Sequence, residues 1–279
     1  MKVIKKIDEL RRELKQYRND KTIGFVPTMG YFHEGHLSLM DRAKAETDIV
    51  VVSLYVNPTQ FGPNEDLAVY PRDFECDEQL AKEHGVDIIF YPDNDEMYPD
   101  GYKTYVYTEE LSKKLCGKSR ENHFKGVTTI ISKLFNIVQP DVAVFGQKDH
   151  QQAIILERMV EDLNIPIKMI IAPIIREKDG LAMSSRNKYL SHEERKQSVI
   201  LSLSLKAAKE SVKKGETSAE IIKQQITSQI NTSSLAKIDY IEIVNSKDLI
   251  DVKIIEKGTF AAVAVYYGKT RLIDNVVLG

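Results

Sequence analysis

Apolar runs alternate with amphipathic helical patterns through the first 175 residues of the chain. Uninterrupted apolar runs are typical of strands buried on both faces of a parallel sheet, with the intervening helices as covering layers. The pattern therefore predicts an α/β fold with a doubly wound, Rossmann-like parallel sheet. The predicted strands are Thr22–Val26, Asp48–Val56, Val86–Tyr91, Asp141–Phe145 and Ile167–Ile175, and the predicted helices are His36–Glu46, Asp77–His84, Gly126–Val138 and His150–Leu163.

The pattern changes after Ile175, where helices and strands come in blocks. Such a block order favours a smaller α+β domain, so we expect two domains, 1–175 and 176–279. The predicted helices are Glu193–Lys214 and Ser218–Ile230, and the predicted strands are Ile238–Val244, Thr259–Tyr267 and Arg271–Leu278.

The N-terminal segment Met1–Lys15 carries Ile4, Ile7, Leu10 and Leu14 at helical spacing among charged residues. This predicts an amphipathic helix and lacks the continuous apolar run of a signal peptide. No stretch approaches the roughly 18 apolar residues of a membrane span. We therefore expect neither a leader nor a membrane anchor.

Charge and cysteine content narrow the function classes. The chain has 39 Lys+Arg against 41 Asp+Glu, a net charge of -2, without the basic excess that binds nucleic acid or an anionic membrane surface. Its two cysteines, Cys76 and Cys116, form no disulfide framework and no CxxC metal site. This usage fits a cytoplasmic protein in a reducing compartment.

Three long polar segments, Asn57–Arg72, Leu115–Lys125 and Arg176–Leu190, fit neither a helical nor a strand pattern. Loops of this length in a compact domain are usually functional or disordered, so we look for the functional residues in and around them.

The segment Pro27-Thr-Met-Gly-Tyr-Phe-His-Glu-Gly-His36 follows the first predicted strand and opens a helix. A strand-to-helix turn at the carboxyl end of a parallel strand is a usual ligand site, and the free N–H groups of a helix start favour phosphate. His33 and His36 could donate hydrogen bonds to phosphoryl oxygens. Two alternatives are open: a metal site, although the spacing is one residue short of HExxH, and histidines buried for structural reasons.

His33-Glu-Gly-His36 resembles the HIGH motif of nucleotidyltransferases and class I aminoacyl-tRNA synthetases. Further blocks, in order along residues 23–190, resemble the pantoate–β-alanine ligase family specifically. They are Val26–Leu39, Tyr55–Gly62 with Glu65–Arg72, His123–Val127, Phe145–Gln152, and Arg176–Asn187 with Tyr189-Leu190.

This resemblance implies the condensation of pantoate with β-alanine, with ATP converted to AMP and pyrophosphate through a pantoyl adenylate. It implies a catalytic domain at 1–175. Because the loop Arg176–Leu190 joins the two parts, we expect the smaller domain at 176–279 to close over ATP as a lid. The family that this chain resembles usually has Glu at the place of Gln147 and an aromatic residue at the place of His150. The implied ATP-binding residues are Met29, Gly30, Tyr31, Phe32, His33, Glu34, Gly35, His36, Gly146, Gln147, Lys148, Asp149, Ile175, Met183, Ser184, Ser185 and Arg186, with His33, His36, Lys148 and Arg186 catalytic.

Amide side chains suit pantoate, which offers hydroxyls and a carboxylate. The resemblance implies Gln60 and Gln152 as its ligands, with Gln60 also at β-alanine. The same site is expected to include Asn57, Tyr70, Arg120 and His123. ATP chemistry of this kind implies Mg²⁺, for which no acidic cage is evident; Asp77 is a candidate ligand.

The resemblance also implies a homodimer, with small-molecule substrates and neither a nucleic-acid nor a membrane partner. Three other functions are weighed against it. The HxGH motif alone also allows a nucleotidylyltransferase, whose product keeps the nucleotide. A tRNA-charging enzyme would need a longer, more basic chain. A non-catalytic ATP- or pantoate-binding module would tolerate loss of His36 or Lys148.

Overall fold

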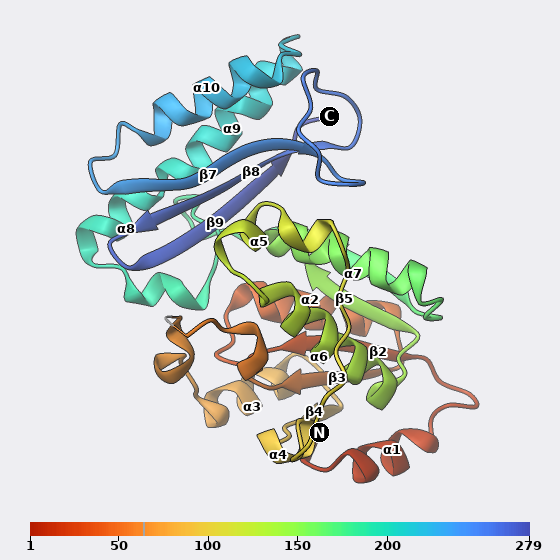
Figure 1. Ribbon diagram of the computed structural model, residues 1–279. Coiled ribbons are helices and arrows are strands. Elements are labelled where there is room, and N and C mark those ends of the chain that lie inside the picture. Colours follow the sequence, from red (N-terminus) through yellow and green to blue (C-terminus); the bar gives the residue numbers. More distant parts are fainter. Residues whose placement is uncertain (64) are drawn as a thin grey trace. The chain divides into compact units, whose positions relative to one another are not determined.

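The computed structural model describes residues 1–63 and 65–279; Asn64, within the predicted loop Asn57–Arg72, lies outside the described residues. The chain forms two compact units (Figure 1). The first comprises Met1–Ser112, Arg120–Gln147 and Ile155–Pro173, and the second comprises Lys113–Ser119, Lys148–Ile154 and Ile174–Gly279. Two short segments that precede Ile174 in the chain, Lys113–Ser119 and Lys148–Ile154, thus belong to the second unit.

The first unit is built on a six-stranded sheet with the order β1-β4-β3-β2-β5-β6. Every strand pair in it is parallel, as the apolar runs predict. The order reverses between β2 and β5, which makes their carboxyl ends the switch point where α/β folds bind ligands. The strands are β1 (Lys2–Ile4), β2 (Ile23–Thr28), β3 (Ile49–Leu54), β4 (Ile88–Phe90), β5 (Val142–Gly146) and β6 (Lys168–Ala172).

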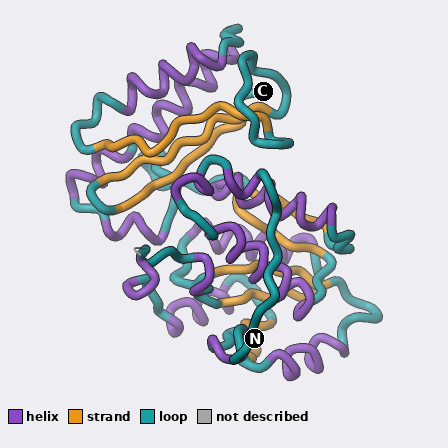
Figure 2. Tube along the Cα trace, viewed as in Figure 1, coloured by secondary structure: helices purple, strands orange, loops and turns teal. Residues whose placement is uncertain are grey.

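Helices cover both faces of this sheet, as Figure 2 shows for the orange strands between purple helices. One apolar cluster joins the sheet to α1 (Ile7–Lys15) and α6 (His123–Val138). A second joins it to α2 (Glu34–Glu46) and α3 (Phe74–Glu83). Two cores on opposite faces define a doubly wound sheet, so the predicted fold class is confirmed.

The second unit is built on a three-stranded antiparallel sheet with the order β7-β8-β9. One face packs on α9 (Ile200–Lys213) and α10 (Ala219–Ile230) (Figure 1). Val263 and Leu272 are among the buried residues of this core. The other face is covered by the segments 113–119 and 148–154, through the contacts Cys116–Tyr240 and His150–Phe260. The strands are β7 (Ala236–Asn245), β8 (Thr259–Tyr267) and β9 (Thr270–Val277).

Several sequence predictions need correction. The N-terminus is not one helix: Lys2–Ile4 form the edge strand β1, whose partner Ile88–Phe90 is remote in sequence. The predicted helix Glu193–Lys214 is two helices, α8 (His192–Ser198) and α9, separated at Val199. The three segments predicted as irregular contain short helices: η1 (Pro58–Gln60), η2 (Asp66–Val69), α5 (Cys116–Ser119) and η5 (Ser185–Tyr189), and α6 already begins at His123.

The remaining elements follow the predicted order. The helix α7 (His150–Asp162) follows β5, and the short helices α4 (Asn94–Met97), η3 (Leu111–Lys113) and η4 (Gln147–Asp149) occupy connections. Among the described residues, no helix is both long enough and apolar enough to cross a membrane.

Candidate functional site

The HxGH segment forms a tight turn between β2 and α2. Gly30 and Tyr31 both have left-handed backbone conformations, with φ of 83° and 55°. Glycine adopts this region without strain, whereas a tyrosine needs its surroundings to hold it there. The turn places His33 at the N-cap and His36 in the first turn of α2, at the switch-point end of β2.

Asp77 of α3 is the group that holds this turn. It is 1% exposed, and its two carboxylate oxygens accept hydrogen bonds from the backbone N–H groups of Tyr31 and Phe32, each at 2.7 Å. Burial raises the pKa of Asp77 above its usual value, although these N–H donors favour the charged form. The candidate metal ligand thus uses both oxygens to bind the backbone of the HxGH turn.

His33 and His36 have defined tautomers in the N-terminal cap of α2. The Nδ1 of His33 accepts from the N–H of Gly35 at 3.1 Å, and the Nδ1 of His36 accepts from the N–H of His33 at 3.4 Å. A neutral imidazole that accepts through Nδ1 carries its proton on Nε2. Both rings, 4.1 Å apart between centroids, are therefore Nε2 donors, as phosphoryl oxygens require.

Gln60, at the end of η1, lies within a network of short polar contacts in the first unit. Its Nε2 donates to the sulfur of Met29 at 3.1 Å, and its Oε1 accepts from Nδ2 of Asn57 at 3.1 Å. Asn57 is 1% exposed and also donates to the carbonyl of Gly126 at 3.2 Å. A Cβ at Gly126 would lie 2.4 Å from the carbonyl oxygen of Thr59, so α6 and η1 meet backbone to backbone. The structure thus joins Gln60 and Asn57 to Met29 of the HxGH segment.

Arg120 and His123 extend this network. His123 donates from Nδ1 to the carbonyl of Gln60 at 2.8 Å, and its Nε2 lies 2.9 Å from Nη1 of Arg120. Arg120 also forms a bidentate ion pair with Glu65: its Nε donates to Oε1 at 2.7 Å and its Nη2 donates to Oε2 at 2.6 Å. Burial alone would raise the pKa of Glu65, but the guanidinium outweighs it and holds the pKa below its usual value. Sequence reasoning missed this partner, because Glu65 lies 55 positions from Arg120.

Tyr70 is also buried, at 5% exposed, and its ring lies 5.8 Å from that of Phe61 at 74°. Tyr70 is therefore held by packing near the end of the segment Asn57–Arg72.

The Gln147–Asp149 segment follows β5 directly, and from Lys148 onward it belongs to the second unit. The ammonium of Lys148 lies 3.6 Å from Asp149. The ring of His150 lies 4.5 Å from that of Phe260 at 84°, and burial lowers its pKa. Burial thus favours a neutral imidazole at this position.

Gln152, predicted at pantoate, is half-buried, whereas its neighbour Gln151 is 7% exposed. Gln151 accepts from the N–H of Cys116 at 2.9 Å and donates to the carbonyl of Lys114 at 2.7 Å. Gln151 is thus a structural residue that orders the segment 113–119, and no local sequence signal separates the two glutamines by role.

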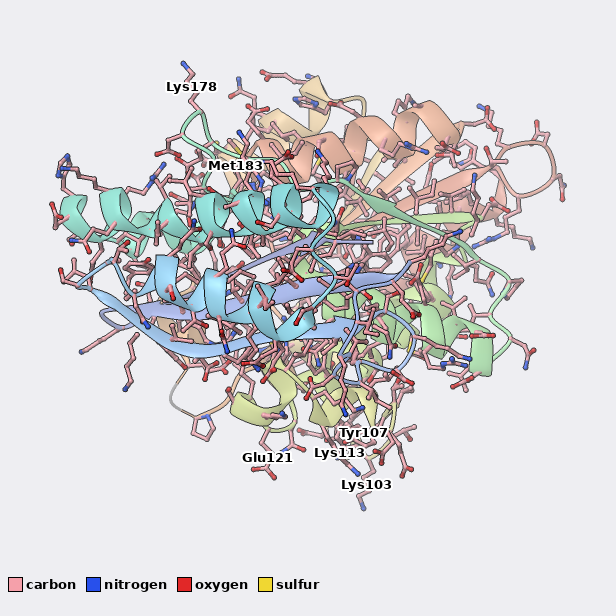
Figure 3. All side chains as sticks on the ribbon, turned by 90° about the horizontal axis from the view of Figure 1, so that it is seen from above. Lys103, Tyr107, Lys113, Glu121, Lys178 and Met183 are labelled. Carbon is pink, nitrogen blue, oxygen red and sulfur yellow. The ribbon has the colours of Figure 1, made fainter. Side chains whose placement is uncertain are left out.

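The Arg176–Leu190 segment is an ordered loop of the second unit. Arg176 and Ala182 form a bridge, and the N–H of Met183 donates to the carbonyl of Ile175 at 3.0 Å. Ser184 caps η5 by accepting from the N–H of Arg186 at 3.3 Å. In Figure 3, the labelled Lys178 projects outward from this loop, on which the labelled Met183 also lies. The loop presents adjacent hydroxyls and a guanidinium, the groups that bind phosphate oxygens.

Within the described residues, 1–63 and 65–279, no group of three or more His, Cys, Asp or Glu side chains is placed to bind a metal ion. A Mg²⁺ ion bound here would take most of its ligands from phosphate oxygens and water, as this ion commonly does.

Comparison with known proteins covers the whole chain. Residues 2–277 match the family model described as pantoate-beta-alanine ligase. The pantothenate synthetase of Acetivibrio thermocellus is 55% identical over 279 residues, which cover 100% of this chain and 99% of that one. The pantothenate synthetase of Thermotoga petrophila is 54% identical over 280 residues and is covered completely.

Solved structures agree with this. The pantothenate synthetase of Thermus thermophilus superposes with a TM-score of 0.96 at 41% identity, covering 100% of this chain and 99% of that one. The pantoate-beta-alanine ligase of Francisella tularensis, solved in complex with beta-gamma ATP and beta-alanine, superposes with a TM-score of 0.81 at 33% identity, covering 99% of this chain and 97% of that one.

Proposed function

The chain belongs to the pantoate–β-alanine ligase family, and from this membership we propose that it joins pantoate to β-alanine with the consumption of ATP, giving pantothenate, AMP and pyrophosphate. The observation that carries the proposal is the family match over residues 2–277, which includes every candidate site residue. The reaction activates a carboxylate as an acyl adenylate and then transfers the acyl group to an amine, so the enzyme is an AMP-forming ligase.

In the first step, a pantoate carboxylate oxygen attacks the α-phosphorus of ATP and pyrophosphate leaves. Charge develops on phosphoryl oxygens, so catalysis requires positioned hydrogen-bond donors rather than a proton acceptor. The Nε2–H groups of His33 and His36 at the start of α2 supply such donors. Met29–His36 are the proposed ATP contacts of this segment, and Asp77 keeps its backbone in the required conformation.

Lys148 and Arg186 are the proposed cationic ligands of the phosphate chain. Lys148 follows β5, and Asp149 beside it suits the ribose hydroxyls. Ser184 and Ser185 add hydroxyl and N–H donors next to Arg186. The backbone of Ile175 is the proposed adenine contact. Gly146 and Gln147 complete the proposed ATP contacts. A Cβ added at Gly146 would meet open space.

Gln60 and Gln152 are the proposed ligands of the pantoate hydroxyls and carboxylate. Asn57 orients the amide of Gln60, since it donates to Oε1 and so leaves the amide group only one orientation. Tyr70, Arg120 and His123 are proposed to line the same subsite. In the second step, the neutral amine of β-alanine, held in part by Gln60, attacks the acyl carbon of the adenylate and AMP leaves.

Mg²⁺ is proposed to arrive with ATP as part of the substrate. The described residues offer no cluster of three metal-binding side chains, and Asp77 is engaged by two backbone N–H groups. The homodimer stays a prediction from the family resemblance, and the cytoplasmic location and closure of 176–279 over ATP as a lid stay predictions from the sequence. Light scattering tests the dimer, and protease protection of the loop 176–190 by ATP plus pantoate tests the lid.

The decisive experiment is isotope exchange between pyrophosphate and ATP in the absence of β-alanine. Exchange that depends on pantoate, followed by release of AMP and pantothenate when β-alanine is added, is the expected result. ADP and phosphate as products would contradict the proposal. A product that retains the nucleotide, identified by mass spectrometry, would instead indicate a nucleotidylyltransferase.

A further inference from the structure

Two consecutive residues of β9, Asp274 and Asn275, are buried polar side chains outside the site described so far. They are 3% and 4% exposed. Neighbouring residues of a strand point to opposite faces of the sheet. Asp274 lies on the face that packs against α9 and α10, with Leu272 and Val276, and Asn275 lies on the face covered by 148–154. Each side chain makes a hydrogen bond to a different proposed phosphate-binding segment.

Asp274 holds the base of the loop that carries Met183–Arg186. Its carboxylate forms a bidentate ion pair with Arg176, in which Oδ2 accepts from Nη1 at 2.6 Å and Oδ1 accepts from Nη2 at 2.9 Å. Arg176 also donates to the carbonyl of Gly180 at 3.1 Å, and it bridges Ala182 across the loop. The guanidinium therefore ties both limbs of the loop to β9. A two-pronged pair of planar groups fixes orientation as well as distance.

Asn275 holds the segment that carries Lys148. Its Nδ2 donates to the carbonyl oxygen of Lys148 at 3.0 Å. The contact is made to the backbone, so it fixes where the lysine side chain starts without engaging its ammonium. The packing of His150 on Phe260 in β8 holds the same segment on the same face. Consequently, Lys148 and the Met183–Arg186 loop are both attached to one strand.

We propose that Asp274 and Asn275 are positioning residues for the adenylation step, holding Lys148 and the Met183–Arg186 loop at a fixed spacing that matches the phosphate chain of ATP. This inference rests on the proposed function. Displacing a catalytic group by about 1 Å can cost roughly a hundredfold in rate. The second step uses no triphosphate, so it should not depend on this spacing.

The test compares the two half-reactions in Asn275→Ala. Pantoate-dependent pyrophosphate exchange is expected to fall about tenfold to a hundredfold, with a raised KM for ATP. Conversion of supplied pantoyl adenylate and β-alanine should stay within about twofold of the unmodified enzyme. A general structural defect would lower both half-reactions together, and that result would overturn the inference.

The matched control is Asn245→Ala at the end of β7 in the same sheet. The Asn245 side chain accepts from the N–H groups of Lys247 and Asp248, so its loss tests the sheet without touching Lys148. The ratio of the half-reactions should not change in this variant. If Asn275→Ala fails to fold, Asn275→Asp replaces it. Aspartate has the shape of asparagine but lacks its N–H donor, so the same selective loss of pyrophosphate exchange is expected.

A double-mutant cycle with Lys148→Ala asks whether Asn275 acts through Lys148. In the Lys148→Ala background, Asn275→Ala should cause little further loss of exchange, because residues that act through one another are not additive. Fully additive losses would contradict the positioning role. An unmodified enzyme that forms no adenylate would instead refute the proposed function, so the two failures are distinguishable.

Discussion

The main-chain carbonyl of Gln60 accepts a hydrogen bond from Nδ1 of His123 at 2.8 Å. Since Nδ1 donates, the Nε2 of a neutral His123 accepts from Arg120, which in turn pairs with Glu65. One chain of hydrogen bonds therefore runs from an ion pair to the backbone of the proposed pantoate ligand. The ionisation of Glu65 is thereby linked to the order of the proposed pantoate subsite.

Glu65→Gln should change how stability depends on pH. The pKa of Glu65 is held below its usual 4.5, so the stabilisation from its charged form is complete above that value and is lost as the pH falls through the lower folded-state pKa. The unmodified protein should thus lose its advantage over Glu65→Gln on acidification. Urea unfolding followed between neutral pH and about pH 3 measures the difference. A difference that does not vary with pH would contradict the linkage.

Asp77→Asn should damage the HxGH turn. The amide replaces one acceptor with a donor that faces a backbone N–H, and leaving a buried group unsatisfied costs about 1–3 kcal/mol. We expect this loss of stability in urea unfolding, together with a reduced pantoate-dependent exchange. The Mg²⁺ concentration for half-maximal activity should not change. A large rise in that concentration would instead identify Asp77 as a metal ligand.

Asp73→Ala is the matched control on the same helix. Asp73 caps α3 by accepting from the N–H of Cys76 at 3.2 Å, so its loss should cost about 1 kcal/mol of stability. The exchange rate at saturating substrates should remain close to that of the unmodified protein.

Gly126→Ala should weaken pantoate binding. Alanine in a helix is normally favoured over glycine by about 1 kcal/mol, but here its Cβ would lie 2.4 Å from the carbonyl oxygen of Thr59 and 2.6 Å from the nitrogen of Gln60. Backbone atoms cannot yield as a side chain can, so η1 must move. The KM for pantoate should rise more than the KM for ATP, measured by exchange kinetics. Asn136→Ala, on the exposed side of α6, should alter neither constant.

His36→Ala and Lys148→Ala should each lower turnover at least about a hundredfold, the scale on which one transition-state donor acts. Initial rates of AMP formation measure this effect. His84→Ala provides the control, because His84 pairs with Asp41 further along α2 and not with the first turn of that helix, where His36 lies. Turnover near that of the unmodified protein in both site variants would refute the catalytic roles and favour a binding module.

The sequence predicts the fold well where a strand is signalled by its own residues. The range Thr259–Tyr267 is both the predicted strand and β8, because six of its nine residues are β-branched or aromatic and favour a strand. The prediction fails for Lys2–Ile4, since three residues become a strand only through pairing with Ile88–Phe90, more than eighty positions away.

The candidate site divides in the same way. The HxGH segment is legible as a motif, with its histidines next to a helix start. The partners that hold the motif are not, because Asp77 meets Tyr31 and Phe32 only once α3 packs beside α2. Asn275 likewise has no local signal, since its contact with Lys148 spans 127 positions. Contacts between residues so far apart in sequence form only in the folded chain, so no local sequence pattern predicts them.

The second unit has a further consequence for how this polypeptide can be divided. Because residues 113–119 and 148–154 form one side of its sheet, a fragment beginning at Ile174 would uncover Tyr240 and Phe260 to water. Exposed aromatic surface of this kind promotes aggregation. The part of the chain from Ile174 onward is therefore not an independent folding unit. It could be transferred into another protein only together with the segments 113–119 and 148–154.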